Sequence, residues 1–108
     1  MNQEDRLKIV LHEYRQGVHR IIGDDLDSII LYGSQARGDA ADDSDIDVLC
    51  IMKRPFDYGE LILKTSTVSA EISLEYDVVI STTFVTRSDY EVRHTPFLMN
   101  VRREAVSV

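Results

Sequence analysis

The sequence has few of the features that stabilise small secreted proteins or place a chain in a membrane. Its 108 residues include one cysteine, Cys50, so an internal disulfide is excluded. No apolar run approaches the ~20 residues that a membrane-spanning helix needs, and no signal-peptide pattern is present. Cys50 lies in an apolar run and is expected to pack as a small hydrophobic residue. These absences predict a cytoplasmic protein with no membrane segment.

Positive charge is also scarce. Twelve lysines and arginines face 19 aspartates and glutamates, which gives a formal net charge of −7. Because contacts with phosphates need clustered Lys and Arg, this balance argues against direct binding to nucleic acid. It predicts instead that a protein partner is basic near the contact. With no repeat, low-complexity segment or linker, the chain is expected to form one domain over residues 1–108.

Residues 31–52 contain the most informative pattern. An apolar run over 28–32 predicts a strand that stops at Gly33. Ser34 is a suitable N-cap for a short helix, which Gly38 should end. A strand, a tight turn at Gly33-Ser34 and a short helix are thus expected in direct succession.

A second predicted strand carries Asp45 and Asp47 and continues as an apolar run over 48–51. Because side chains alternate across a strand, both carboxylates should point to one face, with their Cα atoms roughly 6.6 Å apart. Carboxylates in this arrangement can hold hard divalent cations such as Mg²⁺. Unpaired charge is costly in a buried strand, so bound cations are expected here. The other acidic residues nearby are interpreted as a solvated loop: Asp39, Asp42 and Asp43.

The Gly33-Ser34 turn offers what a polyphosphate needs. Gly33 has no Cβ to keep a phosphate away from the backbone. The amides that open the next helix carry the positive end of its dipole, and the Ser34 hydroxyl adds a hydrogen bond. Arg37 could add positive charge. Since turn and carboxylates lie on neighbouring predicted strands, both could hold one metal–nucleotide complex.

This arrangement resembles the signature of the DNA-polymerase-beta-like nucleotidyltransferase superfamily, in which a Gly-Ser pair precedes an Asp-x-Asp motif. Here Gly33-Ser34 is followed by ten residues and then by Asp45-x-Asp47. The fuller string, with Ala36-Arg37-Gly38 before Ser44, is similar to the minimal nucleotidyltransferases. Many of these are encoded beside a HEPN-domain toxin and act as its antitoxin. The resemblance implies an α/β (α+β) fold, a small mixed sheet with helices mainly on one face.

The resemblance also implies roles for individual residues. Asp45 and Asp47 would hold two Mg²⁺ ions, while Gly33 and Ser34 would bind the β- and γ-phosphates of ATP with help from Arg37. A third strand is predicted over residues 75–81. The resemblance makes Asp77, on that strand, the third catalytic carboxylate, which would bind metal or take the acceptor's proton. Glu75 has the same predicted facing and is the rival candidate.

By resemblance, the reaction is transfer of AMP from ATP to a tyrosine of a cognate HEPN toxin ribonuclease, which neutralises the toxin within a hetero-oligomer. Larger relatives carry extra domains for the acceptor, and this chain has no room for one. Two alternatives remain open. The protein could be a binding-only antitoxin that masks the toxin by contact. It could also modify a small molecule, as aminoglycoside nucleotidyltransferases do, with a pocket completed by another subunit.

The remaining elements are predicted from periodicity and caps. Apolar residues recur at helical spacing from Gln3 to Ile22, which predicts a helix that covers the sheet. A second helix should run from the cap Asp57 to about Leu74. Pro96 occupies the expected first position of a last helix, after Thr95 as its N-cap. Residues 82–92 stay ambiguous: residues 82–85 could extend the third strand, and residues 87–89 break it.

Overall fold

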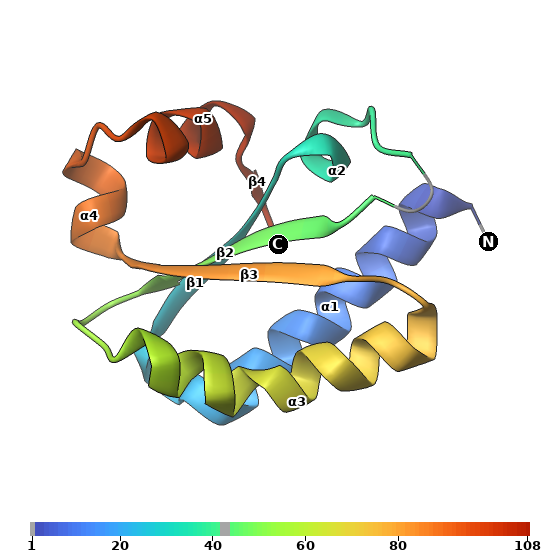
Figure 1. Ribbon diagram of the computed structural model, residues 1–108, viewed down its shortest axis with the longest axis horizontal. Coiled ribbons are helices and arrows are strands. Elements are labelled where there is room, and N and C mark those ends of the chain that lie inside the picture. The colour runs from blue at the N-terminus through green and yellow to red at the C-terminus, as the bar shows by residue number, and fades with distance from the viewer. Residues whose placement is uncertain (1, 42–43) are drawn as a thin grey trace.

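The structure, a computed structural model, describes residues 2–41 and 44–108. Over these ranges it contains a four-stranded mixed sheet and five α-helices, which confirms the predicted α+β fold (Figure 1). The loop interpretation of Asp42 and Asp43 lies outside the described residues. The elements in chain order are α1 (Gln3–Ile22), η1 (Gly23–Asp25), β1 (Leu26–Tyr32), α2 (Ser34–Arg37), β2 (Ile46–Met52), α3 (Tyr58–Tyr76), β3 (Ile80–Thr86), α4 (Arg87–Val92), α5 (Pro96–Glu104) and β4 (Val106–Ser107).

The sheet has the strand order β3-β2-β1-β4. β1 is antiparallel to both of its neighbours, β2 and β4, and β2 is parallel to β3. A parallel pair needs a long crossover, and α3 supplies it here. The amino-terminal ends of β2 and β3 therefore lie side by side, at the end of the sheet where β1 leads into α2 (Figure 1).

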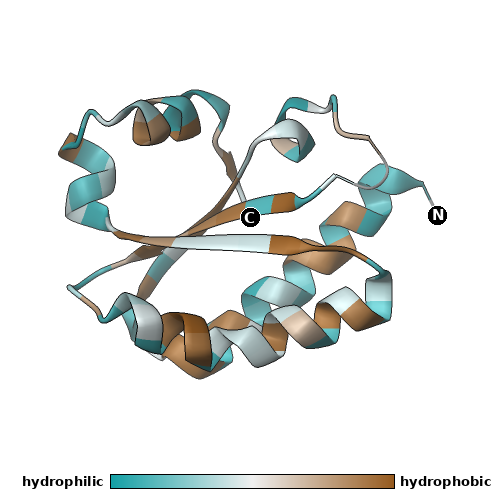
Figure 2. Ribbon diagram, viewed as in Figure 1, coloured by the Kyte–Doolittle hydropathy of each residue, from teal (hydrophilic) through white to brown (hydrophobic). Residues whose placement is uncertain are grey.

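Side chains of β2 alternate between two apolar clusters, so this strand is buried on both faces. Val48 and Cys50 belong to the cluster beneath α1 and α3, whereas Leu49 packs with Leu98 and Val101 of α5. In Figure 2 the strand is accordingly coloured as mostly hydrophobic. The two long helices cover one face, as predicted, and the shorter α4 and α5 lie over part of the other (Figure 1).

The bounds predicted for α1 are confirmed. The Asn2 side chain accepts a hydrogen bond from the Asp5 amide at 2.8 Å and caps the helix, which ends before Gly23. At α3 the predicted cap is also present, because Asp57 Oδ1 accepts from the Glu60 amide at 2.9 Å. Each cap satisfies a backbone N–H that lacks a partner within the helix.

The start of the strand predicted over residues 75–81 is wrong, because β3 begins only at Ile80. α3 continues through Tyr76, and Asp77 ends it in the left-handed conformation with φ 53° and ψ 53°. The Tyr76 hydroxyl donates to Glu13 Oε1 of α1 at 2.7 Å, so contact with α1 holds the last turn of α3 in helical form. The β-branched run that suggested a strand enters β3 only at Ile80, opposite Ile46.

Across residues 2–41 and 44–108, no helix is both long and apolar enough to cross a membrane.

Cys50 is fully buried, and burial raises the pKa of its thiol to about 12. Since the thiolate is the reactive form, we expect almost no reaction with a thiol reagent at about pH 8 while the protein is folded. Complete labelling should follow the addition of denaturant. The measurement is absorbance with Ellman's reagent, with and without guanidinium. Rapid labelling of fully folded protein would contradict the packing seen around β2.

Candidate functional site

The Gly33-Ser34 turn, which was predicted to bind phosphates and is called the phosphate turn below, lies against Asp47, which was predicted to bind metal. β1 ends at Tyr32, which pairs with Asp47 of β2, so Gly33 comes directly beside the Asp47 side chain. A Cβ atom added to Gly33 would overlap Asp47 Oδ2 and lie 3.3 Å from Cγ. The backbone there has φ 78° and ψ −159°, a region that is almost exclusive to glycine. Glycine is therefore required for both space and conformation.

Ser34 is the first residue of α2 and not its N-cap, so that prediction is wrong. Gly33 occupies the cap position, and its carbonyl accepts from the amides of Ala36 and Arg37, both at 3.1 Å. Among the residues that the structure describes, no side chain caps this helix. The glycine conformation already turns the chain into the helix, so the Ser34 hydroxyl is not needed as a cap.

Asp45 lies just before β2, which begins one residue later than predicted, and its side chain is exposed. The residue before it, Ser44, is held from two sides. Ser44 Oγ accepts from the Ala41 amide at 3.0 Å, and its carbonyl accepts from Gln35 Nε2 at 3.3 Å. These bonds fix the segment that carries Asp45 next to α2.

Negative charge is concentrated around Asp47. Its pKa is raised, first by burial and then by the charges of Asp45 and Glu104, with the positive charge of Arg37 acting in the opposite direction. A bound cation would relieve this repulsion. Mg²⁺ prefers oxygen ligands and is usually held by one or two carboxylates together with substrate phosphates. Asp45 and Asp47 fit that requirement.

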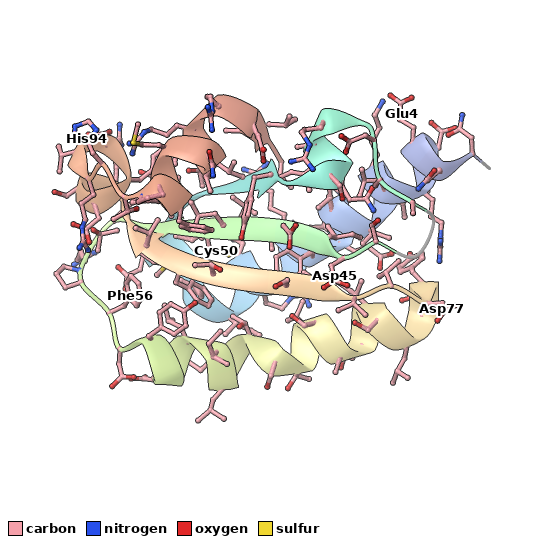
Figure 3. All side chains as sticks on the ribbon, turned by 45° about the horizontal axis from the view of Figure 1, so that its top comes forward. Glu4, Asp45, Cys50, Phe56, Asp77 and His94 are labelled. Carbon is pink, nitrogen blue, oxygen red and sulfur yellow. The ribbon has the colours of Figure 1, made fainter. Side chains whose placement is uncertain are left out.

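Asp77 does not take the position predicted for it. It is exposed at the carboxyl end of α3, whereas Asp45 lies at the start of β2, and the two appear apart in Figure 3. The β3 residue that pairs with Asp47 is Ser81, and Glu75 belongs to α3. Within the part of the chain that the structure describes, no three Asp, Glu, His or Cys side chains form a group that could hold a metal.

Arg37 lies at the edge of the site, and its guanidinium contacts two carboxylates. Nη1 is 2.8 Å from Glu104 Oε1, and Nε is 3.2 Å from Asp39 Oδ2. Glu104 also accepts from the Gly33 amide, through Oε2 at 2.9 Å. Sequence reasoning did not identify Glu104 as a site residue, because it follows Gly33 by 71 positions and no local pattern connects them.

An aromatic pair borders the site. The rings of Tyr32 and Phe97 pack edge to face, with centroids 5.6 Å apart. The pKa of Tyr32 is raised mainly by burial, with a further contribution from the nearby Asp47 charge. This pair joins α5 to the end of β1, next to the Gly33 turn.

Comparison with known proteins assigns the chain to a family. The family model for the nucleotidyltransferase domain matches residues 11–101. A curated relative from Methanocaldococcus jannaschii, named "Putative protein adenylyltransferase MJ0141", is 38% identical over 72 residues, which are 67% of this chain and 72% of the relative. The aminoglycoside nucleotidyltransferase (4') of Staphylococcus aureus is 31% identical over 104 residues. That match covers 90% of this chain but only 38% of the enzyme's own length.

Solved structures share the fold at low sequence identity. A crystal structure of a toxin-antitoxin with AMP-PNP has a TM-score of 0.60 and 16% identity, covering 98% of this chain and 72% of that one. A structure described as a "putative minimal nucleotidyltransferase" also has a TM-score of 0.60, with 18% identity over 94% of this chain and 95% of that one. With the family match spanning most of the chain, these findings confirm the resemblance inferred from Gly33-Ser34 and Asp45-x-Asp47: this protein belongs to the nucleotidyltransferase family.

Proposed function

We propose that this protein transfers AMP from ATP to a tyrosine of a HEPN-domain toxin ribonuclease and so neutralises it. The observation that carries the proposal is the contact between Gly33 and Asp47. It brings a turn suited to phosphates against a carboxylate suited to Mg²⁺, as one metal–nucleotide complex requires.

Each residue has a defined role in this proposal. Asp45 and Asp47 hold two Mg²⁺ ions, and Gly33 and Ser34 bind the β- and γ-phosphates. Arg37, whose charge lies at the edge of the turn, assists in holding the phosphates. When bound, Mg²⁺ supplies positive charge that offsets the negative charge of the phosphate oxygens. The role of Asp77 as third carboxylate stays an untested prediction, because Asp77 ends α3 and does not lie on the strand beside Asp47.

The chemistry is a substitution at the α-phosphorus. The tyrosine oxygen forms a bond to this phosphorus, and the bond from the phosphorus to the bridging oxygen of pyrophosphate breaks. The hydroxyl proton passes to solvent water, and pyrophosphate leaves with the bonding electron pair. The chain contributes by positioning the triphosphate on the Gly33-Ser34 turn, since correct orientation lowers the barrier to such a displacement.

Three observations support a protein as the acceptor. Two curated relatives carry the name "Putative protein adenylyltransferase". Three of the structural neighbours are described as a toxin-antitoxin. The formal charge of −7 also favours a basic protein surface at the contact. The AMP group and the tyrosine acceptor follow from the resemblance to minimal nucleotidyltransferases.

The test is intact mass spectrometry of the protein that co-purifies with this chain. The complex is incubated with Mg²⁺ and each nucleoside triphosphate in turn, and then with ATP labelled at either the α- or the γ-phosphate. We expect the partner to gain nucleoside monophosphate mass with ATP, and to gain the α-label but not the γ-label. Peptide mapping should place the adduct on tyrosine, and Asp47→Asn should abolish it.

Other outcomes would select the alternatives. A tight partner that is neutralised but never gains mass would make this a binding-only antitoxin. The match to an aminoglycoside nucleotidyltransferase over 90% of this chain favours a small-molecule acceptor as the second candidate. Modification of an aminoglycoside by the purified protein, with no change in any partner, would establish that activity and overturn the proposal.

A further inference from the structure

The Glu104 side chain, at the end of α5, contacts the phosphate turn. It is the final residue of α5. Its Oε2 accepts from the Gly33 amide at 2.9 Å, and its Oε1 lies 2.8 Å from Arg37 Nη1. One carboxylate thus holds both the residue before α2 and the residue that ends it.

The Glu104 contacts are more shielded from solvent than the ion pairs of Glu60 and Glu91, and they are charge-assisted. Only 23% of the Glu104 side chain is exposed, compared with 57–58% for Glu60 and Glu91, which also form ion pairs. The Gly33 amide and the Arg37 guanidinium lower the pKa of Glu104, so the carboxylate is ionised near neutral pH. Hydrogen bonds to a charged group are stronger than neutral ones.

The position of Gly33 gives this contact a consequence for the site. The Gly33 backbone lies against the Asp47 carboxylate with no room for a methyl group between them. Whatever holds the Gly33 amide therefore sets the separation of the phosphate turn from the proposed metal ligand. Within the described ranges, the side chain that accepts from this amide is that of Glu104.

We propose that Glu104 is a positioning residue for nucleotide binding: by holding Gly33 and Arg37 it keeps the turn beside Asp47 in the geometry that receives the triphosphate. This inference rests on the proposed nucleotidyl transfer. Glu104 does not contact the nucleotide and acts through Gly33. If Glu104 only stabilised the fold, its removal would leave nucleotide affinity unchanged. If its carboxylate instead occupied the position of a phosphate, its removal would strengthen nucleotide binding.

The test compares Glu104→Ala and Glu104→Gln with wild type by calorimetric titration with Mg·ATP. Loss of a partner that orients a metal ligand costs about 10–100-fold in affinity or activity. We expect a comparable effect for the turn beside Asp47, with at least about a 10-fold rise in Kd for Glu104→Ala. Glu104→Gln retains an oxygen that can accept from Gly33 and should stay closer to wild type. Hydrogen exchange of the Gly33 amide should accelerate in the alanine variant and less in the glutamine variant.

Glu91→Ala is the matched control, because it also removes a glutamate that pairs with an arginine, Arg87, on α4. It should bind Mg·ATP as wild type does. An unchanged Kd in both Glu104 variants overturns the inference, even if their melting temperatures fall, and tighter binding overturns it too. If wild type binds Mg·ATP and Asp47→Asn does not, an unchanged or lower Kd in the Glu104 variants overturns only the role of Glu104 and leaves the proposed function standing. If wild type does not bind Mg·ATP, the proposed function fails and the inference fails with it.

Discussion

Replacing Asp47 with asparagine is expected to reduce nucleotidyl transfer at least about 100-fold while the fold is retained. Loss of a residue that only supports a metal ligand costs 10–100-fold, so loss of a ligand should reach the upper end or exceed it. Asparagine has the same shape but no charge. It removes the cost of burying a charge, which is the main cause of the raised Asp47 pKa, and also the repulsion from Asp45 and Glu104. The stability of the variant should therefore equal or exceed that of wild type.

The measurement is transfer of the α-phosphate label to the acceptor, together with thermal unfolding of both proteins. Asp45→Asn should behave in the same way. Asp24→Asn provides the control, because Asp24 is an exposed aspartate in η1, outside the proposed site. Full activity in Asp47→Asn would remove the basis for a metal site on β2.

Asp77→Asn tests the remaining prediction from the sequence. Asn tolerates the left-handed conformation that Asp77 adopts, so the end of α3 should form normally. We expect activity close to wild type, because Asp77 is exposed at the end of α3 and is not part of β3, the strand that pairs with Asp47. A loss comparable with that of Asp47→Asn, measured by the same transfer assay, would restore Asp77 as the third carboxylate.

Replacing Gly33 with alanine is the second change for which we expect a large effect. The backbone conformation costs a residue other than glycine about 1–3 kcal/mol. The new methyl group would also overlap Asp47 Oδ2, so either the carboxylate or the turn must move. Because both belong to the proposed nucleotide site, we expect a loss of transfer of roughly 100-fold in addition to the loss of stability.

Gly23→Ala separates these two effects. Gly23 has a similar conformation, with φ 73° and ψ −143°. Apart from its two chain neighbours, no described residue has an atom within 4 Å of an added Cβ. It should lose about as much stability from backbone strain, measured by denaturant unfolding, while the folded protein keeps its activity. Equal activity losses in Gly33→Ala and Gly23→Ala would show that strain alone, rather than the contact with Asp47, explains the effect.

Local patterns predicted those parts of the fold that depend on one segment at a time. The apolar spacing from Gln3 to Ile22 matches α1, because one face of this helix supplies buried residues such as Val10 and Val18. The predicted N-caps Asp57 and Thr95 are also confirmed, because a capping side chain accepts from an amide only three residues further along the chain. Where the local signal was ambiguous, as over residues 82–92, the chain divides into the end of β3 and α4.

The sequence by itself determined that the Gly33-Ser34 turn and the Asp45-x-Asp47 motif lie together, because both belong to two adjacent strands and the segment between them. This motif was also sufficient to indicate the family. Only the tertiary structure decided where α3 ends and what holds the phosphate turn. Contact between Tyr76 and Glu13 extends the helix past the predicted strand start and carries Asp77 away from β3. Glu104 reaches Gly33 across 71 positions, a contact that only the packing of α5 on the sheet creates. Periodicity and capping act over a few residues, whereas such contacts depend on the relative placement of whole elements.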